Sequence, residues 1–197
     1  MKRFRFQCFA AMTIAFALVG FGNIGAARAD DIEEYLKVIR PGDYKTVLKT
    51  FRDFLEARQR GDYQTALKII RPLVEKGDAV AQLYFGSMYM SGQGVTQDDK
   101  EAFKWHLLSA QQGLADAQGV VGIAYQNGRG VGQDYILAYM WYELGMPRLA
   151  PGDEKIIKKN LDNIAAKMTA AQIAQAKDMA KKCKASNYKQ CGEGAAW

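Results

Sequence analysis

The chain offers few side chains that could do acid–base or metal chemistry. It has one histidine, His106, and no cysteine or histidine cluster with zinc-ligand spacing. Asp98, Asp99 and Glu101 are the best candidates for paired carboxylates, yet Asp98 and Glu101 also have the spacing of a helix capping box. We therefore expect this acidic group to cap a helix and His106 to be a partly exposed helix residue. The sequence predicts no catalytic residue, no metal and no cofactor.

The N-terminus has the features of a secretory signal peptide over 1–29. A basic start is followed by an uncharged, largely apolar run over 6–27 and by the small-residue exit Ala27-Arg28-Ala29. This order predicts cleavage after Ala29 and a periplasmic or secreted protein. An uncleaved membrane anchor is the alternative, because 22 residues are just enough to span a bilayer.

Two cysteines remain once this leader, which contains Cys8, has been removed. Cys183 and Cys191 both lie near the C-terminus. An even cysteine count in an exported chain favours a disulfide, so we predict a bridge between them. The alternative is a pair of free thiols in a frayed tail.

The basic charge of the whole chain comes mostly from the leader. Residues 1–29 hold four basic and no acidic residues, so cleavage lowers the formal charge from +6 to +2. Nucleic-acid binding then loses its main support, and we predict none. Residues 151–197 hold nine lysines against five acidic residues. This basic end is suited to an anionic lipid, a cell-wall polymer or an acidic protein, or it is simply the solvated face of amphipathic helices.

The strongest pattern in the sequence is an internal repeat with a period of 36 residues. A shift of 36 positions aligns 13 identical residues between 78–113 and 114–149. In each copy, glycines such as Gly92 and Gly94 end a first helix. Gly86 lies inside that helix, which implies close approach of a neighbouring helix. Four aromatic residues recur at packing positions and are predicted to be core: Tyr89, Trp105, Tyr125 and Trp141.

Further helices flank the two copies. Before them, helices are predicted over 43–59 and 62–76, with Pro72 disturbing the second one. After them, two amphipathic helices are expected over 153–167 and 169–182, where they cover the last apolar face of the array.

The first copy has the pattern Ala81-Gln82-x-x-Phe85-Gly86-x-x-Tyr89-x-x-Gly92-x-Gly94-Val95-x-x-Asp98-x-x-x-Ala102-x-x-Trp105, and the second keeps this spacing from Ala117 to Trp141. The pattern resembles the Sel-one-like repeat, a relative of the tetratricopeptide repeat. The resemblance implies an all-α, right-handed α/α solenoid that serves as a scaffold for protein or peptide partners. Some cysteine-rich secreted members bind or hydrolyse β-lactams, but they carry cysteine pairs inside each repeat, and this chain has none there.

The predicted organisation has four parts. These are the signal peptide (1–29), N-terminal capping helices (30–60), Sel-one-like repeats (61–146), and C-terminal capping helices with the disulfide tail (147–197). The predicted function is an exported scaffold, not an enzyme, that binds a protein or peptide on its concave surface. The alternative is a cell-wall-acting or β-lactam-binding enzyme of the envelope. The candidate partner contacts are first-helix residues off the core stripe: Tyr84, Ser87, Val120 and Gln126.

Overall fold

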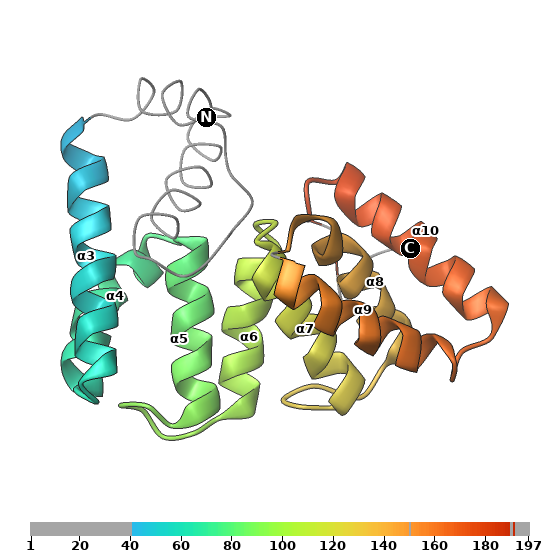
Figure 1. Ribbon diagram of the computed structural model, residues 1–197, viewed down its shortest axis with the longest axis horizontal. Coiled ribbons are helices and arrows are strands. Elements are labelled where there is room, and N and C mark those ends of the chain that lie inside the picture. The colour runs from blue at the N-terminus through green and yellow to red at the C-terminus, as the bar shows by residue number, and fades with distance from the viewer. Residues whose placement is uncertain (1–40, 150, 190, 192–197) are drawn as a thin grey trace. The chain divides into compact units, whose positions relative to one another are not determined.

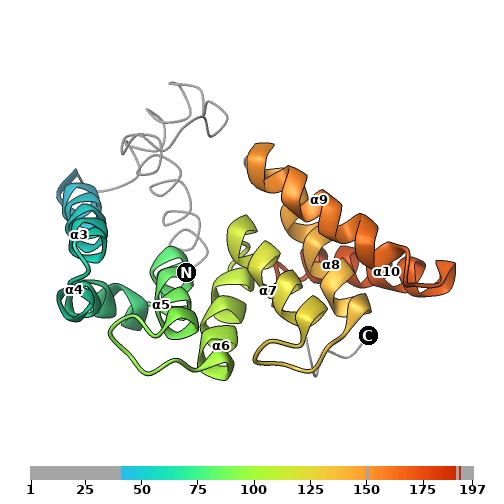
Figure 2. The same ribbon diagram turned by 60° about the horizontal axis from the view of Figure 1, so that its bottom comes forward.

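The computed structural model describes residues 41–149, 151–189 and 191, and every regular element in these ranges is a helix (Figures 1 and 2). In chain order the elements are α3 (Pro41–Gln59), α4 (Tyr63–Glu75), α5 (Ala79–Ser91), α6 (Asp99–Ala110), α7 (Ala115–Asn127), α8 (Tyr135–Gly145), the 3₁₀ helix η1 (Met146–Arg148), α9 (Pro151–Ala165) and α10 (Ala170–Ala185). The predicted all-α fold class is confirmed. The predicted signal peptide and the first part of the predicted N-terminal cap, over 30–40, lie outside the described residues.

The chain divides into two compact units, 1–81 and 82–197. In the described part of the first unit, α3 and α4 pack against each other. Phe54 from α3 and Ile70 from α4 are fully buried. Pro72 lies inside α4 without ending it. The two helices predicted before the repeat are therefore present.

The backbone of the second unit repeats with the period seen in the sequence. Gly92 and Gly128 have φ of 66° and 68°, the left-handed conformation that glycine adopts readily at the end of a helix. Asp98 and Asp134 both have φ of −149°, and each carboxylate accepts hydrogen bonds from two backbone N–H groups at the start of the following helix. The predicted helix stops and aspartate caps are confirmed.

A glycine in the first helix of each copy makes room for a ring from the second helix. A Cβ atom at Gly86 would lie 2.5 Å from Cδ2 of His106, and one at Gly122 would lie 2.5 Å from Cδ1 of Tyr142. His106 is only 2% exposed, so the prediction of a partly exposed histidine was wrong. Its ring fills the space that the glycine leaves, and this burial, with a contribution from Arg129, lowers the pKa of His106 to about 4.

The four aromatic residues predicted as core are not equally buried. Tyr125 and Trp141 are fully buried, whereas Tyr89 and Trp105 are only half-buried. Trp141 belongs to a core cluster to which α9 and α10 contribute, while Trp105 packs edge-on against Phe85 with ring centroids 5.1 Å apart. Both indole Nε1 atoms are nevertheless buried without a hydrogen-bond partner in the described part of the chain. The two tryptophans thus share an environment at Nε1 but differ in how far the rest of each ring is covered.

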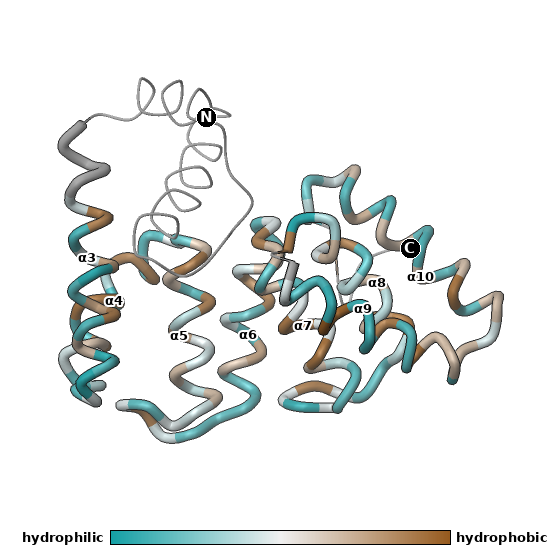
Figure 3. The backbone as a smooth tube through the Cα atoms, viewed as in Figure 1, coloured by the Kyte–Doolittle hydropathy of each residue, from teal (hydrophilic) through white to brown (hydrophobic). Residues whose placement is uncertain are grey.

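The last two helices, α9 and α10, both pack on α8 (Figures 1 and 2). Ile157 and Ile164 of α9 and Met179 of α10 enter the core of the second unit. Hydrophilic residues alternate with hydrophobic ones along both helices (Figure 3). A capping box formed by Thr169 and Gln172 starts α10. Both amphipathic helices therefore form within three residues of their predicted bounds.

Candidate functional site

The acidic residues considered for acid–base chemistry serve structural contacts. Asp98 caps α6, and Asp99 accepts a hydrogen bond of 2.9 Å from Nε of Arg129. Glu101 pairs with Lys104 rather than completing the predicted capping box with Asp98. Over residues 41–149, 151–189 and 191, no group of three or more histidine, cysteine or carboxylate side chains is placed to hold a metal ion. Within the same ranges no helix has the length and apolar character needed to cross a membrane.

The four predicted partner contacts lie on α5 and α7, and all of them are half-buried: Tyr84, Ser87, Val120 and Gln126. Oγ of Ser87 lies 3.4 Å from Nε2 of His106, and Oε1 of Gln126 accepts a hydrogen bond of 2.6 Å from the Tyr142 hydroxyl. Ser87 and Gln126 therefore join the first helix of each pair to the second. None of the four residues lines the pocket described next.

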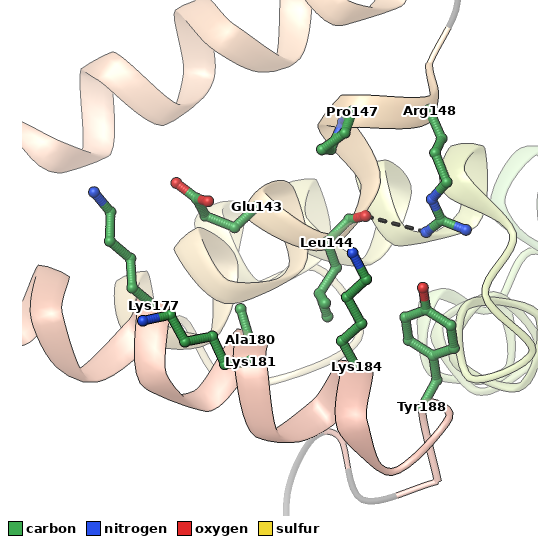
Figure 4. Close-up of a pocket in the computed structure, with 9 residues that line it drawn as sticks. All are labelled: Glu143, Leu144, Pro147, Arg148, Lys177, Ala180, Lys181, Lys184 and Tyr188. Carbon is green, nitrogen blue, oxygen red and sulfur yellow. Dashed lines mark hydrogen bonds between the residues drawn. The ribbon is translucent and has the colours of Figure 1, made fainter.

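A pocket of about 390 Å³ lies at α8, η1 and α10 (Figure 4). Its lining residues are Glu143, Leu144, Pro147, Arg148, Lys177, Ala180, Lys181, Lys184 and Tyr188. The buried side chains of Leu144 and Ala180 give it an apolar base. Four of the lining residues are cationic and one is a carboxylate, so this basic pocket attracts anionic groups.

Three lysines of α10 form one side of the basic pocket. Lys177, Lys181 and Lys184 follow one another at intervals of four and three residues, which places them on one face of the helix. All three are exposed, and none has an ion-pair partner among the described residues. Lys182, which does not line the pocket, instead pairs with Asp178 at 2.9 Å. Among the described residues, these three lysines on the pocket side are therefore unpaired.

Arg148 lines the pocket from η1 and is held in place by several contacts. Its Nη1 donates to the Gly113 carbonyl at 2.7 Å, and its Nη2 donates to Oε1 of Gln118 at 2.7 Å and to the Leu144 carbonyl at 3.1 Å. The guanidinium also lies 5.5 Å from the centroid of the Tyr188 ring. These contacts fix the orientation of a side chain that is otherwise flexible at a surface.

The same kind of hydrogen bond occurs one period earlier. Gln112 lies 36 residues before Arg148, and its Nε2 donates to Oε1 of Gln82 at 2.8 Å. Gln82 and Gln118 are themselves one period apart, and both are buried. Arg148 therefore occupies the repeat position of Gln112 and makes the equivalent hydrogen bond with a charged side chain. The 36-residue alignment carries the signal that would have identified it.

The two cysteines near the C-terminus lie together beside the pocket. The Cα atoms of Cys183 and Cys191 are 5.1 Å apart, a disulfide-capable arrangement, and both side chains are buried. The segment between them carries Tyr188, which has a φ of 61°. Nε2 of Gln111 donates to the Cys191 carbonyl at 3.2 Å. This tail thus places Tyr188 at the edge of the basic pocket.

Sequence reasoning found the basic C-terminal end but not the pocket. The basic end holds nine lysines, and three of them line the pocket once the helices pack. The repeat period marks the position of Arg148, but its meeting with Tyr188 and the lysines depends on how α10 and its tail lie on α8. No period in the sequence relates these segments, so their meeting could not be predicted.

The repeat matches the Sel1 repeat family at residues 79–114 and 115–145. The chain therefore contains two Sel1 repeats. Its two Sel1 repeats cover the helix pairs α5–α6 and α7–α8. The predicted family is confirmed. No curated protein sequence matches this Sel1-repeat chain.

Two solved structures are similar to this Sel1-repeat protein. One is a Sel1 repeat protein from Oxalobacter formigenes, which is 27% identical with a TM-score of 0.45 over 48% of this chain and 38% of its own. The other is c5321, a protective antigen present in uropathogenic Escherichia coli strains and displaying an SLR fold. It is 20% identical with a TM-score of 0.63 over 97% of this chain and 43% of its own. The likeness to c5321 shows the fold alone, and the present chain spans less than half the length of either protein.

Proposed function

We propose that this Sel1-repeat protein is an exported scaffold that binds a protein or peptide partner and has no catalytic activity of its own. Sel1 repeats commonly mediate protein interactions, which supports the general role. The observation that carries the proposal is the basic pocket, where three lysines without ion-pair partners in the described chain adjoin a fixed arginine. Unpaired lysines that lie next to apolar surface are more typical of an interaction site than of a helix face that contacts only solvent.

The arrangement of polar groups argues against a reaction. A catalytic site needs a nucleophile, an acid or a base that is positioned in a pocket with a tuned pKa. His106, the only histidine, is buried against Gly86, and the acidic group at the start of α6 is used in a cap and in ion pairs. The basic pocket contains cations that can bind and orient an anion.

Export is proposed from the N-terminal sequence. The order of basic start, apolar run and small-residue exit over 1–29 is that of a signal peptide. In an exported chain the two cysteines at the tail would oxidise, which would hold Tyr188 beside the pocket. The predicted leader and the cysteine pair of the tail therefore both support a periplasmic or secreted location.

Affinity capture with crosslinking from the exported fraction of the source cells tests the proposal. The mature protein is expected to retain a partner at micromolar concentration, and Lys181→Glu is expected to lose it. Val120→Lys is the comparison for the predicted first-helix surface. If Val120→Lys loses the partner and Lys181→Glu keeps it, the repeat binds through that surface and not through the pocket. If the wild-type protein retains nothing, the scaffold function is wrong.

A separate assay addresses the enzyme alternative. The purified mature protein is expected to leave a chromogenic β-lactam and isolated peptidoglycan unchanged over hours. If either substrate is turned over and a single substitution in the chain abolishes the turnover, the protein is an enzyme and the scaffold proposal is wrong.

A further inference from the structure

The basic pocket has features that define the chemistry of its ligand more closely than a general scaffold role does. We infer that it binds an acidic peptide segment in an extended conformation, with carboxylates at alternate positions facing Lys177, Lys181 and Lys184. This inference rests on the proposed function, because it names the class of partner segment for the same site.

The charge of the pocket selects an anionic ligand. Its three lysines have no ion-pair partner in the described ranges, and Arg148 adds a fourth cation. Glu143, the one carboxylate of the lining, also faces the phenol of Tyr139 and contributes to raising its pKa, which burial raises most. One carboxylate cannot neutralise four cations, so an incoming anion gains favourable electrostatic energy.

The spacing of the first two lysines, Lys177 and Lys181, fits an extended chain. Along a helix axis, residues four and three apart are separated by about 6 Å and about 4.5 Å. In an extended strand, side chains on one face recur every two residues, about 6.6 Å apart. Carboxylates at alternate positions of a strand therefore match the step between Lys177 and Lys181. Adjacent carboxylates point to opposite faces of a strand and cannot both reach the lysines.

The η1 side of the pocket supplies an oriented donor for one end of the segment. Arg148 has five N–H groups, and the three bonds that fix it leave capacity for a carboxylate. Figure 4 shows the Lys184 side chain rising from α10 towards Leu144 and the Tyr188 hydroxyl pointing towards Arg148. Lys184, Arg148 and Tyr188 thus converge on one part of the pocket, where a single carboxylate can take several donors.

A peptide fits this site better than a membrane surface does. Peripheral binding to anionic lipid needs a basic face accompanied by apolar side chains that insert between the headgroups. In the described chain the exposed large apolar side chains are Leu108 and Ile156, and neither lines the pocket. The apolar part of the pocket is instead recessed, with Leu144 and Ala180 buried at its base. It can receive the small side chains that separate the carboxylates of a peptide.

Fluorescence anisotropy with the full mature chain tests the inference. The probe is a fluorescein-labelled peptide in which glutamate alternates with alanine. One control peptide carries glutamine in place of glutamate, and another has the same composition with its glutamates adjacent. The alternating peptide is expected to bind at least about tenfold more tightly than either control, which corresponds to about 1.4 kcal/mol. Equal binding of the two glutamate peptides would overturn the extended arrangement.

Charge reversals locate the binding site. The double variant Lys181→Glu/Lys184→Glu is expected to weaken binding of the alternating peptide at least about tenfold. Lys158→Glu/Lys159→Glu on α9 makes the same change in net charge at two exposed lysines outside the pocket and is expected to change affinity less than about twofold. Circular dichroism confirms that each variant is folded. Equal losses from the double and the control variants would show diffuse charge attraction and overturn the site.

The remaining outcomes separate this inference from the proposed function. The wild-type protein is expected not to bind vesicles of phosphatidylcholine with phosphatidylglycerol. If it binds these vesicles but not the peptide, and the double variant loses vesicle binding, the pocket is a lipid site. If no acidic peptide binds, yet a captured partner is lost on Lys181→Glu, the scaffold stands and the acidic-peptide inference fails. If the peptide binds as expected but no partner is captured from the exported fraction, the pocket chemistry stands and the scaffold function fails.

Discussion

At the scale of single residues, the contact between Gly122 and Tyr142 shows why a helix interior carries a glycine. The ring of Tyr142 is fully buried and lies where a Cβ atom at position 122 would be. Its hydroxyl donates to Gln126, which fixes the ring from its other end. The ring cannot move away from α7 without losing this bond, so the glycine is needed for packing rather than for backbone freedom.

Gly122→Ala is expected to destabilise the protein, while Gly132→Ala is not. Overpacking against Tyr142 lowers the free energy of unfolding by about 1 to 3 kcal/mol. The better helix propensity of alanine offsets about 1 kcal/mol of this loss. A Cβ atom at Gly132 would meet nothing within 4 Å, so it is the matched control. Thermal unfolding followed by circular dichroism should show a lower Tm for Gly122→Ala alone. Equal Tm values for the two variants would mean that the ring adapts freely.

His106 makes the stability of the fold depend on pH. Burial lowers its pKa from 6.5 to about 4, so below pH 6.5 the unfolded chain takes up a proton that the folded chain does not. The free energy of unfolding should therefore fall as the pH falls from 6.5 to about 4, by on the order of 3 kcal/mol for a shift of this size.

Urea unfolding at about pH 7 and about pH 5 measures this dependence. His106→Gln is expected to lose less stability than the wild type over that interval, because it cannot take up the proton. Asp116, whose pKa is raised by burial, is present in both proteins, so its contribution cancels in the comparison. An identical loss in both proteins would remove His106 as the cause.

At the scale of helices, the repeat was predictable because each element carries its own local signals. Asp98 and Asp134 cap helices, and Gly92 and Gly128 end them, through contacts within a few residues. The difference between Trp105 and Trp141 was not predictable, because it depends on which later helices cover each indole. The same limit applies to the basic pocket, since it forms only when α10 packs on α8.

Arg148 joins elements that are distant in the sequence, and its removal should be costly. Arg148→Ala leaves the buried Oε1 of Gln118 and the Gly113 carbonyl without this donor, which is expected to cost about 2 to 3 kcal/mol. Gln112→Ala removes the equivalent bond to Gln82 and should cost about 1 kcal/mol. Chemical denaturation of both variants gives the comparison. A smaller loss for Arg148→Ala than for Gln112→Ala would contradict the role of the arginine as a link.

The tail beyond α10 should be stabilised by oxidation. A bridge between Cys183 and Cys191 would close a short loop and is expected to contribute roughly 2 to 3 kcal/mol. Adding a reductant should lower the Tm of the wild-type protein and leave a Cys183→Ala/Cys191→Ala variant unchanged. A wild-type Tm that does not respond to reductant would show that the two thiols are free.

For the molecule as a whole, the predicted leader and the basic C-terminal end contribute very differently to the net charge. Removing 1–29 lowers the formal charge from +6 to +2, whereas residues 151–197 alone carry +4. The rest of the mature chain is therefore slightly acidic. In the mature protein an anionic partner would be drawn to the C-terminal helices, and in the uncleaved chain the leader would compete for it.

Mass spectrometry of the intact exported protein tests the processing on which this charge distribution depends. The expected species begins at Asp30 and lacks the two hydrogens that a disulfide between Cys183 and Cys191 removes. Reduction should restore them, because Cys8 leaves with the leader and no other cysteine remains. A chain that still begins at Met1 and fractionates with the membrane would make the N-terminus an anchor. The basic pocket would then act beside an anionic surface, and its peptide ligand would have to compete with lipid headgroups for the same lysines.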